Sequence, residues 1–183
     1  MKITLTCLCS LLLTFCAMSQ NKEMKLPAPQ KTGGKPLMEA LAARATNRAL
    51  DPDQSLSQQQ LSNMLWAAWG INRPDGRRTA ASAMNCQEID LYLIGKQGAY
   101  LYNATEHALE PVAEGDFRSQ VSAQEFAKNG DWIVIFVADH NKMKHPNEVT
   151  AGIDAGLIAQ NIYLYGASEN LGVVVHASID RNT

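Results

Sequence analysis

The first residues able to do chemistry are two arginines and a threonine that lie close together in the sequence. The segment Arg44-Ala45-Thr46-Asn47-Arg48 brings two guanidinium groups and a hydroxyl within five residues. Arginine suits a phosphate because its planar fork donates two parallel, charge-assisted hydrogen bonds. Arg44 and Arg48 share a face only if a helix continues through them; if the helix ends there, Arg44, Thr46 and Arg48 can converge on one anion. Considered alone, a solvated helix end is the plainer interpretation.

A second polar group lies in the segment Ala81-Ser82-Ala83-Met84-Asn85-Cys86-Gln87. Its small residues allow close approach to a flat ring, and the amides of Asn85 and Gln87 supply donors and acceptors for the edge of a heterocycle. The alternative is a turn that leads into a strand, in which Asn85 bonds to its own backbone. The residues alone leave both interpretations open.

Spacings typical of several other sites are missing from the sequence. The four histidines show no HxxxH spacing and no CxxC pair occurs, so no metal site is predicted. No G-x-S-x-G elbow, P-loop or G-x-G-x-x-G motif is present, so neither a serine hydrolase nor a Rossmann NAD site is supported. Cys86 lacks a local protease signature, and we interpret it as a buried, inert thiol.

The composition and the first residues bound the class of protein. The chain has 183 residues with 16 basic and 18 acidic side chains, and this near-neutral balance argues against a nucleic-acid partner. Residues 1–19 are typical of a secretory signal, because a short apolar run ends in Ala17-Met18-Ser19 and suits cleavage before Gln20. That run is too short for a stable membrane span. We therefore expect an exported protein, periplasmic or secreted; a lipoprotein anchored at Cys16 is the less favoured alternative.

One folded domain should follow this signal. Residues 20–35 contain two prolines and two glycines without periodicity, which predicts a flexible leader. Residues 36–183 have the length of one ordinary domain with its own core.

Two helices are predicted early in the domain. Pro36 suits the first position of a helix that ends near Arg44. The buried face of this helix is predicted to carry Leu37, Ala40 and Leu41. Ser57 and Gln60 form a capping box that opens a second helix, and Gly70 ends it. Its buried residues follow at helical spacing: Leu61, Met64, Leu65, Ala68 and Trp69.

Two more helices are predicted later in the chain. Ser122 and Glu125 resemble a second capping box, which opens a short helix that ends at Gly130. The stretch 148–171 is the longest periodic one and predicts a helix that Gly172 stops. Its apolar side is predicted to carry Ile153, Leu157, Ile162, Leu164, Ala167 and Leu171.

Strand signals alternate with these helices. Residues 88–94 alternate in polarity and are followed by a turn and a return strand at 99–102, which predicts a hairpin. One face of the first strand carries Ile89, Leu91 and Leu93. The apolar run 132–138 predicts a central strand buried on both faces, and 173–179 predicts a last strand. The order of elements indicates a single α+β domain.

Taken together, these motifs resemble the FMN-dependent nitroreductase family. An R-x-S-x-R motif of that family is matched by Arg44, Thr46 and Arg48. A P-S-x-x-N-x-Q motif is matched by Ser82, Asn85 and Gln87, with Ala81 in place of proline. Residues 65–73 resemble the branch that contains the SagB-type and thiazoline-oxidase dehydrogenases, and residues 154–161 resemble the long central helix of the family. The resemblance covers roughly residues 36–180 and four motifs in the expected order.

The resemblance implies a fold and a cofactor site. It implies a central, mostly antiparallel sheet flanked by helices, in a homodimer with FMN at the interface. Arg44, Thr46 and Arg48 would hold the flavin phosphate and ribityl chain. Ser82, Ala83 and Asn85 would reach the flavin from the partner subunit. The strand that carries His176, Ala177 and Ser178 would run beside the flavin ring, with backbone N–H groups at its reactive N5; Gln124 is a weaker candidate.

The implied activity is hydride transfer through flavin N5 to or from a small organic substrate, which requires no catalytic side chain. NAD(P)H is one candidate donor, but an exported enzyme would use another donor or oxidise its own substrate. Members of the family continue beyond the last strand matched here, so the C-terminal portion is expected to be truncated. This leaves an alternative: a non-catalytic nitroreductase-like binding domain, or a truncated fragment with an incomplete flavin site.

Overall fold

The computed structural model describes residues 22–122 and 124–177. In chain order its helices and strands are β1 (Met24–Lys25), α1 (Leu37–Ala43), α2 (Gln58–Trp69), the 3-10 turn η1 (Ala83–Asn85), β2 (Ile89–Ile94), β3 (Gly98–Asn103), β4 (Ala108–Glu114), α3 (Arg118–Val121), α4 (Glu125–Asn129), β5 (Ile133–Ala138), the 3-10 turn η2 (His140–Lys142) and α5 (Glu148–Glu169).

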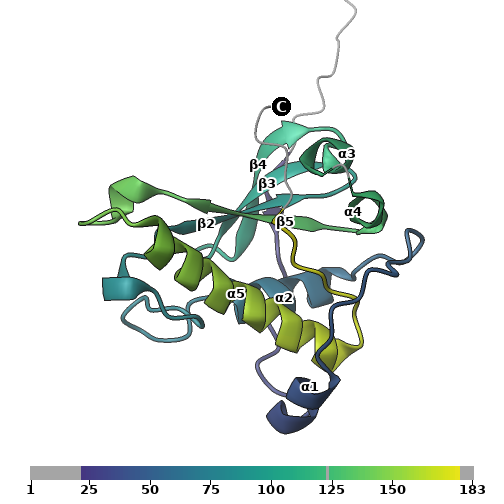
Figure 1. The fold of residues 1–183 in the computed structure, drawn as a ribbon, viewed down its shortest axis with the longest axis horizontal. Coiled ribbons are helices and arrows are strands. Elements are labelled where there is room, and N and C mark those ends of the chain that lie inside the picture. The colour runs from purple at the N-terminus through teal and green to yellow at the C-terminus, as the bar shows by residue number, and fades with distance from the viewer. Residues whose placement is uncertain (1–21, 123, 178–183) are drawn as a thin grey trace, which may run out of the picture.

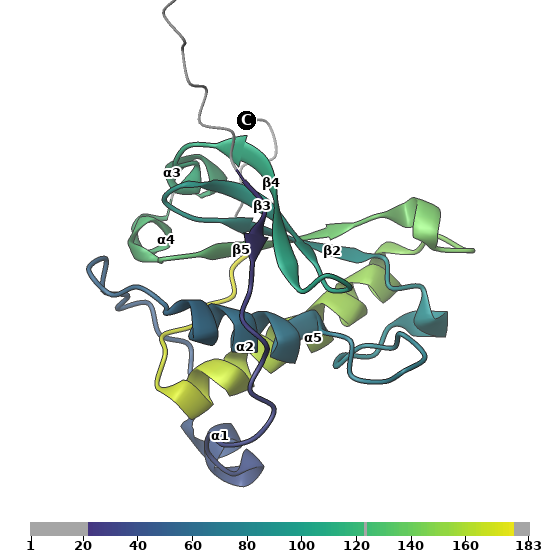
Figure 2. The ribbon, with the colours of Figure 1, turned by 180° about the vertical axis from the view of Figure 1, so that it is seen from behind.

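The strands form one antiparallel sheet in the order β1-β4-β3-β2-β5. Figures 1 and 2 show α2 and α5 packed on one face of this sheet, with α1 beyond them, at the end of α5 far from the sheet. The arrangement confirms the predicted α+β class, an antiparallel sheet flanked by helices.

The core lies between the sheet and the helices α2 and α5. Ser57 and Gln60 make both bonds of the predicted capping box, and α2 ends before Gly70 as expected. All five predicted core residues of α2 are buried. The Trp69 indole Nε1 donates to the Ile89 carbonyl at 2.8 Å, which fixes α2 against the first strand of the predicted hairpin. The apolar face of that strand is buried as predicted: Ile89, Leu91 and Leu93.

The sequence patterns did not predict β4, which pairs with β3 along its whole length. Pro111 and the acidic residues of this strand weaken its signal, since proline cannot donate to a sheet ladder. The register between β3 and β4 shifts between Ala99 and Tyr100, and Tyr100 lies opposite Pro111. The proline therefore occupies an irregularity in the ladder, where its missing N–H costs little.

The prediction of a central strand at 132–138 was wrong, because β5 lies at the edge of the sheet and pairs only with β2 among the described strands. Most of its residues are half-buried, and Val137 is exposed. The predicted last strand is not formed either: residues 173–177 have no regular structure, and residues 178–179 lie outside the described part. An apolar run indicates an apolar environment and does not identify the neighbours that provide it.

The predicted faces and ends of three helices also need correction. Pro36 caps α1 instead of starting it, and Leu37 and Leu41 are exposed, which leaves Ala40 as the buried residue. Ile153 and Leu157 of α5 are likewise exposed, so the apolar pattern of α5 is only partly core. Its buried residues are Ala151, Asp154, Ile158, Ile162 and Gly166. The residue that ends α5 is the left-handed Asn170, ahead of Gly172.

The predicted capping box of α4 is not formed. Gln124, not Ser122, is the N-cap of α4, and it makes no side-chain capping bond. The Gln124 N–H donates to Ser122 Oγ at 3.1 Å.

The described part of the predicted leader, residues 22–35, is packed on the domain. Its strand β1 pairs with β4, and the Pro27 carbonyl accepts a 2.6 Å bond from Ser62 Oγ of α2. Near its end, Lys35 Nζ donates to the carbonyl of Ala167 at 2.8 Å. A leader rich in proline and glycine can bind by its backbone groups without hydrophobic periodicity, so its pattern gave no signal.

Candidate functional site

The C-terminal end of α5 fixes the path of residues 171–177. Asn170 adopts a left-handed conformation with φ of 59°, and the Leu171 N–H donates to the Gly166 carbonyl at 2.8 Å. A Cβ atom at Gly166 would collide with the side chain of Val173. The absence of a side chain at Gly166 therefore allows this segment to lie directly on α5.

Residues 44–48 run beside this segment because α1 ends at Ala43. The Asn47 N–H donates to the Val173 carbonyl at 2.9 Å. Tyr163 of α5 joins the two segments: its hydroxyl accepts from the Val175 N–H at 2.9 Å and lies 3.0 Å from Thr46 Oγ1. Since the phenol oxygen already accepts from the amide, its own hydrogen is available to Thr46. The Arg44 guanidinium lies over the Tyr163 ring, 5.4 Å from its centroid.

Arg48 reaches the same segment through an aromatic pair. Its guanidinium carbon lies 5.7 Å from the centroid of the Phe126 ring. The His176 ring meets Phe126 edge-on, with centroids 5.4 Å apart and planes at 87°. The structure thus brings together the first predicted group and His176, and Ala177 follows directly; Ser178 lies outside the described residues.

Two features of this cluster leave it able to bind an anion. Within the described part of the chain, no carboxylate pairs with Arg44 or Arg48. Their contacts with ring faces are worth about 0.5–1 kcal/mol each at exposed sites and leave the guanidinium N–H donors available. The His176 Nδ1 atom is buried without a described hydrogen-bond partner, so one ring nitrogen also remains unused.

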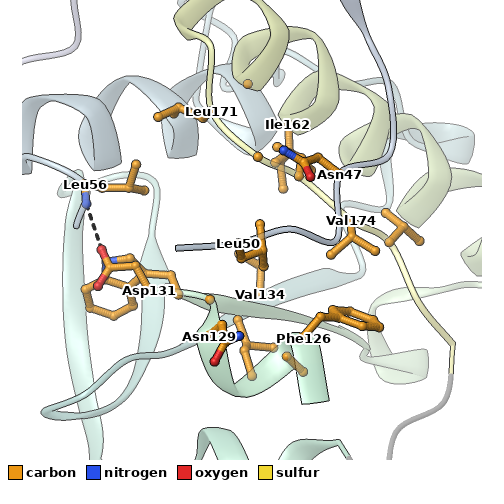
Figure 3. A pocket seen from close by; sticks show the side chains of 18 of the residues that line it. Asn47, Leu50, Leu56, Phe126, Asn129, Asp131, Val134, Ile162, Leu171 and Val174 are labelled. Carbon is orange, nitrogen blue, oxygen red and sulfur yellow. Dashed lines mark hydrogen bonds between the residues drawn. The ribbon is translucent and has the colours of Figure 1, made fainter. Parts of the chain in front are cut away.

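A cavity of about 710 Å³ adjoins the cluster, between β5, α5 and the segment before α2. Figure 3 shows Leu50, Val134 and Phe126 among its largely apolar lining side chains. The cavity shares Asn47, Phe126 and residues 171–177 with the cluster, whereas Arg44, Thr46 and Arg48 do not line it. The arginine site therefore lies beside this cavity and not inside it.

The second predicted group forms a tight loop before β2. Met84, Asn85 and Gln87 all have left-handed backbones, with φ of 52°, 55° and 50°. Each such non-glycine residue costs about 1–2 kcal/mol, so the loop persists only because other groups hold it. Ser82 Oγ accepts from the Gln87 N–H at 3.0 Å. Cys86, expected to be buried, is half-buried in this loop.

Two neighbouring elements anchor this loop. From the loop that follows α2, Arg78 Nε donates to Gln87 Oε1 at 2.8 Å. From α5, Asp154 Oδ2 accepts from the Ala83 N–H at 2.8 Å. Asp154 and Tyr163 are nine residues apart on α5, about 13 Å along the helix axis. Within one chain the structure therefore does not bring Ser82, Ala83 and Asn85 to the arginine cluster.

The described residues contain no group of three or more histidine, cysteine, aspartate or glutamate side chains that could hold a metal ion. Among the helices of the described residues, none combines the length and the hydropathy needed to span a bilayer.

Similarity to known proteins identifies the family. A profile of the nitroreductase family matches residues 41–182. A protein from Ralstonia eutropha JMP134, assigned as a nitroreductase and solved by crystallography, is 39% identical with a TM-score of 0.80, over 87% of this chain and 78% of that chain. The chain belongs to the nitroreductase family.

More distant structures share the nitroreductase fold. A Desulfovibrio desulfuricans protein assigned as a nitroreductase, solved in complex with FMN, is 19% identical with a TM-score of 0.50, over 73% of this chain and 63% of that chain. The E. coli microcin synthetase McbBCD complex contains a chain that is 17% identical with a TM-score of 0.58, over 90% of this chain and 71% of that chain. At these identities the likeness concerns the fold alone. No curated protein matched the sequence.

Sequence reasoning missed three residues that organise the candidate site of this member of the nitroreductase family. Tyr163 and Phe126 carry the contacts of the arginines, and Asp154 holds the 82–87 loop. A tyrosine in a helix indicates that a hydroxyl needs a partner, but the partner is distant in sequence and no local pattern identifies it. A signal for Asp154 did exist, since an acidic residue occurs within an otherwise apolar helix pattern.

Proposed function

We propose that this nitroreductase-family protein is an FMN-dependent oxidoreductase that transfers hydride between a donor and a small organic substrate. The observation that carries the proposal is the cluster at the end of α5, where Arg44 and Arg48 lie beside residues 173–177 without a carboxylate partner among the described residues. Family membership supports flavin chemistry in general.

The residues present fit FMN. A phosphate needs charge-assisted donors, and no described carboxylate pairs with the guanidinium groups of Arg44 and Arg48. A flavin ring needs backbone donors along one edge, and the N–H groups of His176 and Ala177 donate to no other described residue. Burial of the unpartnered His176 Nδ1 costs free energy unless a further group pairs with it.

The residues would divide the work as follows. Arg44 and Arg48 would bind the phosphate and Thr46 the ribityl chain, while Tyr163 fixes the position of Thr46 through its hydroxyl. His176, Ala177 and Ser178 would present backbone N–H groups to the ring. FMN, when bound, would supply hydride transfer through its N5 atom. The protein's part would be binding, orientation and electrostatics, so the proposal requires no catalytic side chain.

A homodimer completes the proposed site. Apolar side chains stand exposed along one side of α1 and α5: Leu37, Met38, Leu41, Val149, Ile153 and Leu157. Gly152 and Gly156 lie beside these residues of α5 in sequence and have open space above them. If two copies pack these faces about a two-fold axis with their α5 helices antiparallel, the Asp154 region of one copy approaches the Tyr163 region of the other. Ser82, Ala83 and Asn85 would then reach the cofactor from the partner subunit.

The dimer is tested by Ile153→Asp, since Ile153 is 59% exposed in one chain and its loss should not disturb the core. We expect wild type to sediment as a dimer and the variant as a monomer with lower FMN affinity. Val112→Asp is the matched control, because Val112 is similarly exposed but lies on β4. A monomeric wild type, or a variant that remains dimeric, would contradict this interface.

The cofactor is tested directly by titrating FMN into the purified chain and following the quenching of flavin fluorescence. We expect saturable binding, a yellow protein and release of FMN on denaturation. Failure of the folded dimer to bind FMN would reject the cofactor proposal and favour the non-catalytic alternative. Cycling of bound flavin between oxidised and reduced forms would reject that alternative.

Three finer parts of the proposal rest on the sequence. Residues 65–73 favour the SagB-type branch, so thiazoline-like substrates belong in a reoxidation screen beside nitroaromatics and quinones. Residues 1–19 favour export, which N-terminal sequencing of secreted or periplasmic protein would test by finding Gln20 first. Export would separate the enzyme from cytoplasmic NAD(P)H, so the screen should compare NAD(P)H with artificial donors.

A further inference from the structure

Glu88 is a fully buried acid whose side chain meets no hydrogen-bond donor from another described residue. Its side chain is 0% exposed, between the 82–87 loop and β2. No N–H or O–H donor of another described residue bonds to either of its carboxylate oxygens. An ionised carboxylate in this position would lose its hydration without compensation, which favours the neutral acid.

A second buried acid, Asp154, lies within hydrogen-bonding reach of the Glu88 side chain. Asp154 of α5 is 3% exposed, and its Oδ2 atom accepts the hydrogen bond from the Ala83 N–H. Two carboxylates this close cannot both be ionised at low cost, but one proton shared between them makes a strong hydrogen bond. Asp154 already accepts a hydrogen bond from the Ala83 amide, whereas Glu88 has no hydrogen-bond donor from another described residue, so we place the shared proton on Glu88.

We propose that Glu88 keeps its proton near neutral pH and donates it to Asp154, and that this acid–carboxylate pair positions residues 82–87. The role in cofactor binding rests on the proposed function, because those residues include Ser82, Ala83 and Asn85. The pair ties the loop to α5 and to β2 at once. It thereby supports a segment that contains three left-handed residues.

The electrostatics around Glu88 agree with this assignment. Burial raises the pKa of Glu88 above its ordinary value of 4.5, and the neighbouring Asp154 raises that pKa further. Its own backbone amide and Lys142 of η2 lower the pKa, but Lys142 Nζ is held by Asp90 Oδ1 at 2.6 Å. Asp154 from α5 and Lys142 from η2 are the charged side chains that act on Glu88.

A raised carboxyl pKa has a defined effect on stability. The folded state holds the Glu88 proton over a pH range in which the unfolded state has lost it. The stabilising contribution is therefore complete below about pH 4.5 and is lost as the pH rises through the folded-state pKa. Within this window, the titration of Glu88 alone should lower the folding equilibrium constant by up to about tenfold per pH unit.

The test measures urea unfolding from pH 4.5 to 8.5 for wild type, Glu88→Gln and the control Glu114→Gln, whose side chain is exposed at the end of β4. Glutamine at position 88 still donates to Asp154 but cannot titrate, so we expect Glu88→Gln to lack this part of the pH dependence while the control keeps it. A pH dependence in Glu88→Gln equal to that of wild type would overturn the shared proton.

The positioning role needs a separate measurement. Hydrogen exchange of peptides that cover residues 82–87 should be faster in Glu88→Ala than in wild type, and Glu88→Gln should restore slow exchange. If Glu88→Ala does not fold, Asp154→Asn serves instead, because its amide can donate to an ionised Glu88 and should reduce the same pH dependence, leaving the part that burial causes. Unchanged exchange in Glu88→Ala, or an unchanged pH dependence in Asp154→Asn, would reject the pair.

Titration with FMN separates this inference from the proposed function. If wild type binds no FMN but the unfolding and exchange results hold, the pair stands and the flavin proposal fails. If FMN binds and Glu88→Gln titrates like wild type, the flavin proposal stands and the pair fails. Weaker FMN binding by Glu88→Ala, restored in Glu88→Gln, supports both.

Discussion

Arg44→Ala separates a phosphate-binding role from a structural one. The Arg44 guanidinium lies over the face of the Tyr163 ring, 5.4 Å from its centroid, and pairs with no carboxylate of the described residues. Loss of that contact costs about 0.5–1 kcal/mol of folding free energy. A charge-assisted bond to phosphate is worth about 1.5–3 kcal/mol, so we expect the Kd for FMN to rise about 10- to 150-fold.

Riboflavin makes the assay specific, since it carries the same ring and ribityl chain without the phosphate. FMN and riboflavin are titrated into wild type, Arg44→Ala and the control Arg77→Ala, whose exposed side chain pairs with Asp75. We expect Arg44→Ala to weaken FMN binding and leave riboflavin binding nearly unchanged, with the difference shrinking at high salt. An equal loss for both ligands would mean that Arg44 acts through folding, and no loss for FMN would refute the phosphate assignment.

Two further predictions concern stability. Ser57→Ala removes the capping box with Gln60. We expect the free energy of unfolding, measured with urea, to fall by about 0.5–2 kcal/mol. The affinity of the folded variant for FMN should not change. His107 joins Tyr102 and Ser62 through its two ring nitrogens, at 3.0 and 2.7 Å, and burial lowers its pKa. A lowered histidine pKa gives stability that is present above about pH 6.5 and lost as the pH falls through the folded-state value, so His107→Phe should flatten the acid side of the stability profile. An unchanged profile in His107→Phe, or an unchanged urea midpoint in Ser57→Ala, would contradict these assignments.

The sequence predicted elements whose signals are local. The bonds of the capping box at Ser57 and Gln60 span three residues, and the buried positions of α2 repeat along one helix, so both follow from short segments. The hairpin of β2 and β3 is equally local, because its turn contains Gly95 and Gly98. In these cases the pattern and the tertiary packing favour the same structure.

The errors concern what covers an apolar surface. Leu37, Leu41 and Ile153 follow the pattern of core residues but are exposed in the single chain. Periodicity shows that a face is apolar, and both a core and a subunit interface satisfy that pattern. The edge position of β5 was missed for the same reason, since an apolar run does not determine which strands pair with it.

The resemblance names residues for the candidate site, and these stay a prediction; it does not name the residues that connect them. The resemblance implies that Arg44, Thr46 and His176 belong to one site, and the structure brings their segments together. The groups that connect them, Tyr163 and Phe126, lie far from their partners in sequence, so no spacing rule could identify them. A resemblance transfers the residues that contact a cofactor more readily than the residues that support them.

Single variants are needed to separate the pH dependence of stability that Glu88 contributes from the pH dependence that His107 contributes. Glu88 and His107 both favour their neutral forms because they are buried, but one is an acid and the other a base. As the pH rises from about 4.5 to 6.5, Glu88 loses stabilising free energy while His107 gains it, so the two slopes oppose each other. The combined pH dependence of the two groups in this range should therefore be weaker than that of the group with the steeper slope alone. Glu88→Gln should expose the rising slope of His107, and His107→Phe the falling slope of Glu88.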